Sequence, residues 1–391
     1  MLELTPDNTW SYLRDRGWIR GSTNRVEALA WGVSNVVLRV ESEFGPAVVV
    51  KQSREQLRTP AKWVSRLDRI WREADVMREI APLLPAGVVP RVLHEDRENY
   101  VFVMEAAPAD HVVWKQSLLD GRADPRIAGQ LGSYLATVHR QTAGRDDFRE
   151  RWGDREVFVQ LRVDPFYHRV ADQHADVRPA IEQMIDEMWE TAVCLVHADF
   201  SPKNVLVHSS GLTLVDYETA HFGDPAFDLG FLLSHLLLKT ILHADRFDEY
   251  ATLTTSFWKS YLGTLNAITD PDAPAESFPP GREIPANHIG SQPVLPLPIA
   301  MRSLNATWPK SVKLALSGPA LLRRTIPHLA GCMWARIDGT SRVDYLSRES
   351  QQAVVRGFCR DLLLNGARTW TDVLSRLRQQ VSAHRLPEAA S

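Results

Sequence analysis

The stretch from Val193 to Gly230, VCLVHADFSPKNVLVHSSGLTLVDYETAHFGDPAFDLG, concentrates polar side chains between apolar runs that favour burial. An acid that is removed from water without a partner costs several kcal/mol. A run of this kind therefore needs cations, hydrogen bonds or both. The polar side chains here that could do chemistry are His197, Asp199, Asn204, Asp216, Glu218, Asp224 and Asp228.

Two runs within this stretch are predicted to form a β-hairpin. CLVHADFSPKNVLV has strand-like ends around a polar centre, GLTLVDYE is a second short strand, and HSSG joins them. Because residues at the start and end of a hairpin can face one point, Asp199, Asn204 and Asp216 are expected to converge. Magnesium prefers hard oxygen ligands and keeps part of its shell for phosphate, so one amide oxygen and one carboxylate suffice. We therefore predict that Asn204 and Asp216 hold Mg²⁺ carried by a nucleotide.

The spacing His-x-Asp-x-x-x-x-Asn also has an ordinary interpretation, namely a turn whose side chains satisfy one another. The later aspartate inside an apolar strand favours catalysis, because kinase-like phosphotransferases place a base and two magnesium ligands in this order. On that interpretation Asp199 accepts a hydrogen bond from the hydroxyl that attacks the terminal phosphoryl group of ATP.

An independent part of the chain supports this chemistry. The strand VVVK ends in Lys51, and a helix that contains Glu73 follows it. In kinase-type sites such a lysine touches the α- and β-phosphates and is held by a helix carboxylate, for which we favour Glu73 over Glu79 and Asp68. A lysine at a strand end is otherwise usually solvent-exposed. The turn before the second strand would bring backbone amides of Gly32, Ser34 and Asn35 over the phosphates, with an ordinary hairpin turn as the equal alternative.

These residues need a two-lobe, α+β architecture to position them. Short β-rich runs between Arg25 and Gln52 predict a three-stranded antiparallel meander, helical spacing predicts a helix over 61–82, and VPRVLHED and NYVFVMEA predict two more strands. Beyond Ala107 the pattern is mostly helical. We expect an N-terminal nucleotide-binding lobe over 1–107 and a catalytic, substrate-binding lobe over 108–391. Prolines without periodicity predict an irregular insertion over 270–319.

Bulk properties exclude several classes of protein. The 391 residues are 44% hydrophobic and 24% charged with a formal net charge of -3, and the basic residues are spread along the chain, so no nucleic-acid or membrane partner is expected. Three widely spaced cysteines give neither a disulfide framework nor a metal knuckle. The chain start lacks the order of a secretory signal, so we expect a cytoplasmic protein, with a homodimer left open.

From Arg25 to Leu238 the chain resembles the aminoglycoside phosphotransferase and choline kinase superfamily, small-molecule relatives of the protein kinases. Ala198 stands where protein kinases carry an arginine, and no Ala-Pro-Glu segment follows, which disfavours a regulated protein kinase. The resemblance implies a kinase fold with ATP and Mg²⁺ as cofactors. It implies that Asp199 is the catalytic base, that Asn204 and Asp216 bind the metal, and that Lys51 and Glu73 orient the phosphates. It also implies that the backbone of Glu105 and Ala107 in YVFVMEAA forms an adenine hinge, that Asp228 braces the catalytic loop, and that His197 is structural.

Some features are similar to methylthioribose kinases. Asp216-Tyr217-Glu218 resembles their Asp-x-Glu, in which the second acid also approaches the metal. The run around Arg336 resembles the helix from which those enzymes supply paired arginines to the sugar, although Ala335 occupies the other position. We expect direct in-line transfer to a small hydroxylated metabolite, with methylthioribose or a related sugar leading. An aminoglycoside, choline or amino-alcohol kinase and a non-catalytic, nucleotide-binding pseudokinase are the alternatives.

Overall fold

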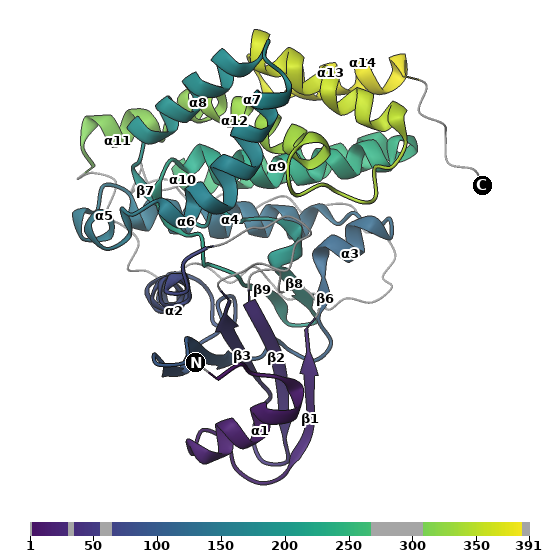
Figure 1. Cartoon of the computed structure of the whole chain (residues 1–391). Coiled ribbons are helices and arrows are strands. Elements are labelled where there is room, and N and C mark those ends of the chain that lie inside the picture. Colours follow the sequence, from purple (N-terminus) through teal and green to yellow (C-terminus); the bar gives the residue numbers. More distant parts are fainter. Residues whose placement is uncertain (1, 30–34, 55–64, 267–307, 385–391) are drawn as a thin grey trace, which may run out of the picture.

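The computed structural model describes residues 2–29, 35–54, 65–266 and 308–384. A small antiparallel sheet forms the first part of the chain, and the remainder is mainly helical (Figure 1). This is the α+β class expected from the sequence. The lobe boundary between residues 107 and 108 stays a prediction.

The N-terminal sheet has five antiparallel strands in the spatial order β1-β2-β3-β5-β4, which confirms the five predicted strands. Successive side chains of a strand point to opposite faces, so in β3 Val48 and Val50 enter one core and Val49 enters the other. Every residue of β3 is buried, because both faces of the sheet are covered. The strands are β1 (Thr23–Ala28), β2 (Asn35–Ser42), β3 (Val48–Ser53), β4 (Val92–Asp96) and β5 (Val101–Glu105).

Two helices cover these faces. Helix α1 (Pro6–Asp15) contributes Tyr12 to the core that contains Val50, and α2 (Arg69–Ile80) contributes Ile70 to the core that contains Val49. The sequence analysis did not predict α1, whose apolar residues are few. Its start is fixed by local signals instead, namely a proline in the first turn and an asparagine side chain that accepts from the Thr5 N–H at 2.8 Å.

The helix predicted over 61–82 is wrong at its start. Residues 61–64 lie outside the described residues, 65–68 are not helical, and α2 begins at Arg69. The Arg69 guanidinium donates to the carbonyl oxygens of Ser65 and Arg66, which holds this segment as a turn before the helix. A 3₁₀ turn, η1 (Ala81–Leu83), follows the helix.

The C-terminal part is built around one almost entirely buried helix, α9 (Pro225–Leu242). It is long and apolar enough to cross a membrane by length and composition, but 89% of it is buried inside the protein, as in a core helix. The other helical elements are α3 (Trp114–Leu119), α4 (Pro125–Thr142), α5 (Asp146–Trp152), α6 (Glu156–Phe158), η2 (Val159–His168), α7 (Arg169–Gln173), α8 (Arg178–Glu190), η3 (Pro202–Asn204), η4 (Ala244–Arg246), α10 (Phe247–Asn266), α11 (Lys310–Ala315), α12 (Gly318–Asp338), α13 (Glu349–Asn365) and α14 (Trp370–Ala383).

The irregular segment predicted over 270–319 is wrong in its last part. Residues up to 307 lie outside the described residues, but α11 occupies 310–315 and α12 begins at Gly318. Pro309 precedes α11, and Pro319 lies in the first turn of α12. Proline is well tolerated in these positions, because the first N–H groups of a helix have no partner within it. The prolines here start helices and do not break them.

The stretch from Val193 to Gly230 contributes strands to two small sheets. Strand β7 (Cys194–Val196) pairs with β10 (His221–Gly223), whereas β8 (Val205–His208) and β9 (Gly211–Leu214) form a hairpin that a short strand, β6 (Val112–Val113), extends. The hairpin across HSSG is confirmed. The run CLV does not belong to it, because the polar residues between Val196 and Val205 form a loop and the 3₁₀ turn η3.

Two helical glycines give a matched test of the packing between α4 and α10. A Cβ at Gly132 of α4 would collide with the backbone oxygen of Phe257 in α10, whereas a Cβ at the exposed Gly263 of α10 would meet nothing within 4 Å. We expect Gly132→Ala to destabilise the protein by about 1–3 kcal/mol through overpacking. Gly263→Ala should stabilise it by about 0.5–1 kcal/mol. Urea denaturation of both variants measures the difference, and equal effects would contradict this packing.

Candidate active site

One buried ammonium group joins three elements. Lys51 shares the face of β3 that Val49 occupies and therefore faces α2. Its Nζ lies 2.6 Å from Oε2 of Glu73 on α2 and 2.7 Å from Oδ1 of Asp216, just after β9. The side chains of Lys51 and Glu73 are 5% and 0% exposed, whereas that of Asp216 is 21% exposed. The predicted Lys51–Glu73 contact is present, and the accessible carboxylate of the cluster is Asp216.

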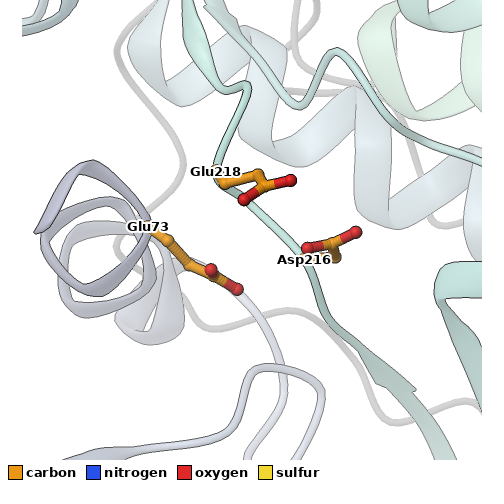
Figure 2. Close-up of side chains that lie close together, drawn as sticks. All are labelled: Glu73, Asp216 and Glu218. Carbon is orange, nitrogen blue, oxygen red and sulfur yellow. The ribbon is translucent and has the colours of Figure 1, made fainter. Parts of the chain in front are cut away.

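Three carboxylates meet around this lysine. Oxygen atoms of Glu73, Asp216 and Glu218 lie within 4.8 Å of one another (Figure 2). Glu218 is held by the Arg69 Nε at 3.0 Å and the Asn35 Nδ2 at 2.8 Å, both of which donate to its Oε2. A group of oxygen donors of this kind suits a hard divalent cation.

The charges of this cluster decide its protonation. Burial alone would raise the pKa of Asp216, but the positive charges of Lys51 and Lys203 hold that pKa well below its usual range. Burial raises the pKa of Glu73, and Lys51 offsets only part of that effect. Asp216 is therefore ionised at neutral pH and can hold a cation, while the charge of the deeper Glu73 depends on its lysine.

A second group of contacts surrounds Asp199. Its Oδ1 lies 2.7 Å from the Arg162 Nη2, and its Oδ2 lies 2.8 Å from the Lys203 Nζ and 2.9 Å from the donating Asn204 Nδ2. The Lys203 Nζ also lies 3.8 Å from Oδ2 of Asp216 and so connects the two acids. Asn204 donates through Nδ2 to both the side chain and the backbone oxygen of Asp199, which leaves its amide oxygen available as a ligand.

A buried aspartate in the first turn of α9 supports the loop that carries Asp199. The Asp228 carboxylate accepts from the backbone N–H groups of His197 and Ala198, each at 2.7 Å, and lies 3.1 Å from the His139 Nε2. Ala198 has φ 60°, a left-handed conformation that costs a non-glycine residue about 1–2 kcal/mol. The two hydrogen bonds to Asp228 stabilise that conformation, as the predicted bracing role requires.

His197 is part of the same support. Its Nδ1 accepts from the Asp199 N–H at 3.2 Å, and its ring packs 4.4 Å from the ring of Tyr217. Burial lowers the pKa of His197, so the imidazole is neutral at pH 7. This environment fits the structural role predicted for it.

The predicted nucleotide contacts outside this cluster are only partly described. Gly32 and Ser34 lie outside the described residues. Asn35 begins β2, and its buried side chain contacts Glu218, a contact that the sequence did not indicate. Glu105 ends β5, where its carboxylate contacts the exposed Arg91. The Ala107 carbonyl accepts from the Arg39 Nη1 at 3.3 Å, and the adenine-hinge role of Glu105 and Ala107 stays a prediction.

Arg336 lies on α12 and is partly buried. Its Nη1 donates to the Ser341 Oγ at 2.8 Å, and its guanidinium lies 5.8 Å from the centre of the Phe166 ring. Burial lowers the pKa of Arg336, while the negative charge of Asp199 opposes this effect. The guanidinium of Arg162, which pairs with Asp199, lies 5.8 Å from the centre of the same Phe166 ring. The substrate-binding role of Arg336 stays a prediction.

Two cations of the site, Arg162 and Arg69, were not predicted from the sequence. Arg162 pairs with Asp199 from η2, a π-helical segment that no periodicity indicated. For Lys203 the sequence favours an exposed side chain, with a contact to the γ-phosphate as the alternative; in the structure it pairs with Asp199 while its side chain remains 42% exposed. Arg69 was not considered, although a buried acid such as Glu218 next to the metal ligands implied a buried cation.

The comparisons with known proteins agree with this geometry. Residues 25–253 match the phosphotransferase enzyme family, abbreviated APH, over more than half of the chain. The chain belongs to this phosphotransferase family. It is similar to methylthioribose kinases from Erwinia tasmaniensis, with 28% identity over 58% of this chain and 64% of the relative, and from Exiguobacterium sibiricum, with 24% identity over 67% and 73%. The match thus spans less than two thirds of the length of the Erwinia enzyme.

Solved structures confirm the fold of an APH phosphotransferase. Choline kinase from Cryptosporidium parvum matches with a TM-score of 0.50 and 13% identity, over 97% of this chain and 98% of that one. An amicoumacin kinase in complex with AMP-PNP, Ca²⁺ and amicoumacin also matches with a TM-score of 0.50, at 14% identity over 90% and 92%. The predicted kinase-like architecture is therefore correct.

The bracing of the catalytic loop can be tested through Asp228. Asp228→Asn keeps the shape of the side chain but replaces one acceptor oxygen by a donor, which would face a buried N–H. We expect a loss of at least ~1–3 kcal/mol in the free energy of unfolding. Asp186→Asn, at an exposed position of α8, is the control and should change stability by less than about 0.5 kcal/mol.

The same substitution should change the pH dependence of stability. Burial alone would raise the pKa of Asp228, but His139 and the loop N–H groups hold it below its ordinary value. An acid with a depressed pKa in the folded state stabilises the protein above its unfolded-state pKa and loses that contribution as the pH falls. The difference in the free energy of unfolding between wild type and Asp228→Asn should therefore become smaller below about pH 4. A difference that is constant down to acid unfolding would contradict this role.

Proposed function

We propose that this protein transfers the γ-phosphoryl group of ATP directly to a hydroxyl of a small metabolite, with methylthioribose or a related sugar as the leading acceptor class. The observation that carries the proposal is the pair of linked acids. Lys203 connects Asp199, which has no place in the metal cluster, to Asp216, which belongs to it. Asp199 can then accept a hydrogen bond from the incoming hydroxyl while Asp216 binds the metal ion of the nucleotide.

The residues present fit a nucleotide-bound magnesium ion. The amide oxygen of Asn204 and the ionised carboxylate of Asp216 supply hard donors, and Glu218 stands beside them. When bound, the ion would neutralise charge on the phosphates during transfer. Lys51 already carries its charge beside Asp216 and would bind the phosphates of the nucleotide as a second cation. The metal roles of Asn204, Asp216 and Glu218 and the nucleotide roles of Lys51 and Glu73 are parts of this proposal.

Asp199 orients the acceptor and receives its proton. Arg162 and Asn204 fix the carboxylate from two sides, so that one rotamer is favoured before substrate binds. As the acceptor oxygen bonds to the γ-phosphorus, the bond from that phosphorus to the β–γ bridging oxygen breaks, and the hydroxyl proton passes to Asp199. The half-exposed Lys203 can leave Asp199 and follow the transferred group. No nucleophilic side chain takes the phosphoryl group, so no phosphoenzyme forms.

A non-catalytic pseudokinase is the less favoured alternative. Such a protein could bind ATP but would not need an acid that is separately oriented for an acceptor. Here Asp199 is held by three donors, and two hydrogen bonds to Asp228 maintain the strained backbone next to it. The number of buried polar contacts that orient the Asp199 carboxylate favours a catalytic protein over a pseudokinase.

Replacing the base tests the proposal directly. Asp199→Asn keeps the size of the side chain but cannot accept the proton, so turnover should fall by ~10² to 10⁴. Nucleotide affinity should change little, because Lys51 and Asp216 are intact. The assay is ATP consumption with Mg²⁺ over a panel of sugars, amino alcohols and aminoglycosides, and calorimetry measures ATP binding. Asp186→Asn is the control, and full activity in Asp199→Asn would refute the assignment.

The metal role of Asp216 predicts the opposite pattern. Asp216→Asn removes the ionised ligand and leaves Lys51 without one of its two carboxylates. We expect the thermal stabilisation that Mg²⁺ and ATP together give the wild type to be largely lost in this variant, whereas Asp199→Asn should retain it. A thermal-shift titration with ATP, with and without Mg²⁺, measures this. Equal stabilisation of the Asp216 variant and the wild type would contradict the role.

A further inference from the structure

Two arginines near Asp199 share one aromatic ring. Arg162, which pairs with Asp199 at 2.7 Å, has its guanidinium 5.8 Å from the centre of the Phe166 ring. The guanidinium of Arg336 lies 5.8 Å from the centre of the same ring. The guanidinium groups of Arg162 and Arg336 therefore lie near Asp199, and of these two only Arg162 forms an ion pair with it.

A buried lysine extends this group. Lys239, in the last turn of the apolar helix α9, has 0% of its surface exposed. Its Nζ donates to the Tyr345 hydroxyl at 3.0 Å and lies 4.8 Å from the centre of that ring. Among the described residues it forms no ion pair. Nearby, the Nε of Arg336 is buried and makes no hydrogen bond to any described residue.

The surroundings of Lys239 are short of negative charge. Burial lowers the pKa of Lys239, the positive charges of Lys115 and Arg336 lower it further, and only Asp344 opposes them. Asp344 is exposed, and it also acts on Lys115. Burial and the positive charges of Lys239 and Arg336 likewise lower the pKa of His235. Burial without a carboxylate partner disfavours the charged form of Lys239, and an anion bound beside it would favour that form again.

We propose that the acceptor carries an anionic group, a carboxylate or a phosphate, which binds at Lys239 and Arg336 while its hydroxyl is presented to Asp199. This inference rests on the proposed function of the same site. An anion would supply the missing partner of Lys239 and a partner for the buried Nε of Arg336. Methylthioribose itself is uncharged, and choline and aminoglycosides are cations that these side chains would repel, so a related sugar acid or sugar phosphate fits best.

Binding to the full chain without nucleotide tests this inference independently of transfer. The probes are ribose, ribonate, ribose 5-phosphate and choline, measured by calorimetry at constant ionic strength. We expect ribonate or ribose 5-phosphate to bind at least about 10-fold more tightly than ribose, since hydrogen bonds between charged groups are stronger. Preference between the two anions separates a carboxylate from a phosphate site. Equal affinity for ribose and both anions, or tighter binding of choline, overturns the proposal.

Two substitutions locate the effect. Lys239→Met and Arg336→Gln should each weaken binding of the preferred anion about 10- to 100-fold, and Lys239→Met should leave the affinity for ribose unchanged. Lys239→Met should also raise the denaturation midpoint, because it removes a buried amine that has no carboxylate partner and keeps a similar volume. Lys259→Met, at an exposed position of α10, is the matched control for loss of one positive charge and should change nothing. Unchanged anion affinity in both site variants overturns the assignment.

Turnover separates this inference from the proposed function. If the enzyme binds the anion but neither phosphorylates it nor consumes ATP with any panel member, the proposed function fails while the anion site stands. If it phosphorylates ribose or choline with a kcat/KM equal to that of the anions, the anion site fails while the proposed function stands. With both correct, Lys239→Met raises KM for the anion by about 10- to 100-fold and leaves kcat nearly unchanged.

Discussion

The ammonium group of Lys51 is the point on which the rest of the site depends. It lies within 2.7 Å of two carboxylates from different elements, Glu73 on α2 and Asp216 after β9, and so ties the N-terminal sheet to the helical part of the chain. Because both faces of β3 are buried, Lys51 cannot turn to water without breaking the packing around Val49. The site is therefore set by burial before any ligand binds.

The same logic applies to the loop that carries Asp199. A left-handed Ala198 turns the chain sharply, and the buried Asp228 makes that turn stable by accepting both adjacent N–H groups. Arg162 then fixes one face of the Asp199 carboxylate. In this chain Asp199 is anchored to the helical part and Asp216 is tied to the sheet through Lys51, and the half-exposed Lys203 connects the two acids.

Local sequence signals predicted the five strands of the large sheet, because strand alternation depends on nearby residues. The contact between Lys51 and Glu73 was predicted instead from the order of residues in kinase-type sites. The errors came from tertiary contacts. Arg69 delays the start of α2 by binding carbonyl groups that precede it, which no periodicity reveals. The sequence shows that a lysine, Lys239, lies near the end of the apolar helix α9, but only the fold shows that no carboxylate pairs with it among the described residues.

A crystal structure with Mn²⁺ and AMP-PNP tests the central claim most directly, because the anomalous signal of manganese locates the ion without assumption. The account predicts one or two ions bound by the Asp216 carboxylate and the Asn204 amide oxygen, with the Lys51 Nζ on the phosphates. Asp199 should face the γ-phosphate without binding metal. Manganese bound elsewhere, or bound by Asp199 with Asp216 turned away, would contradict the account.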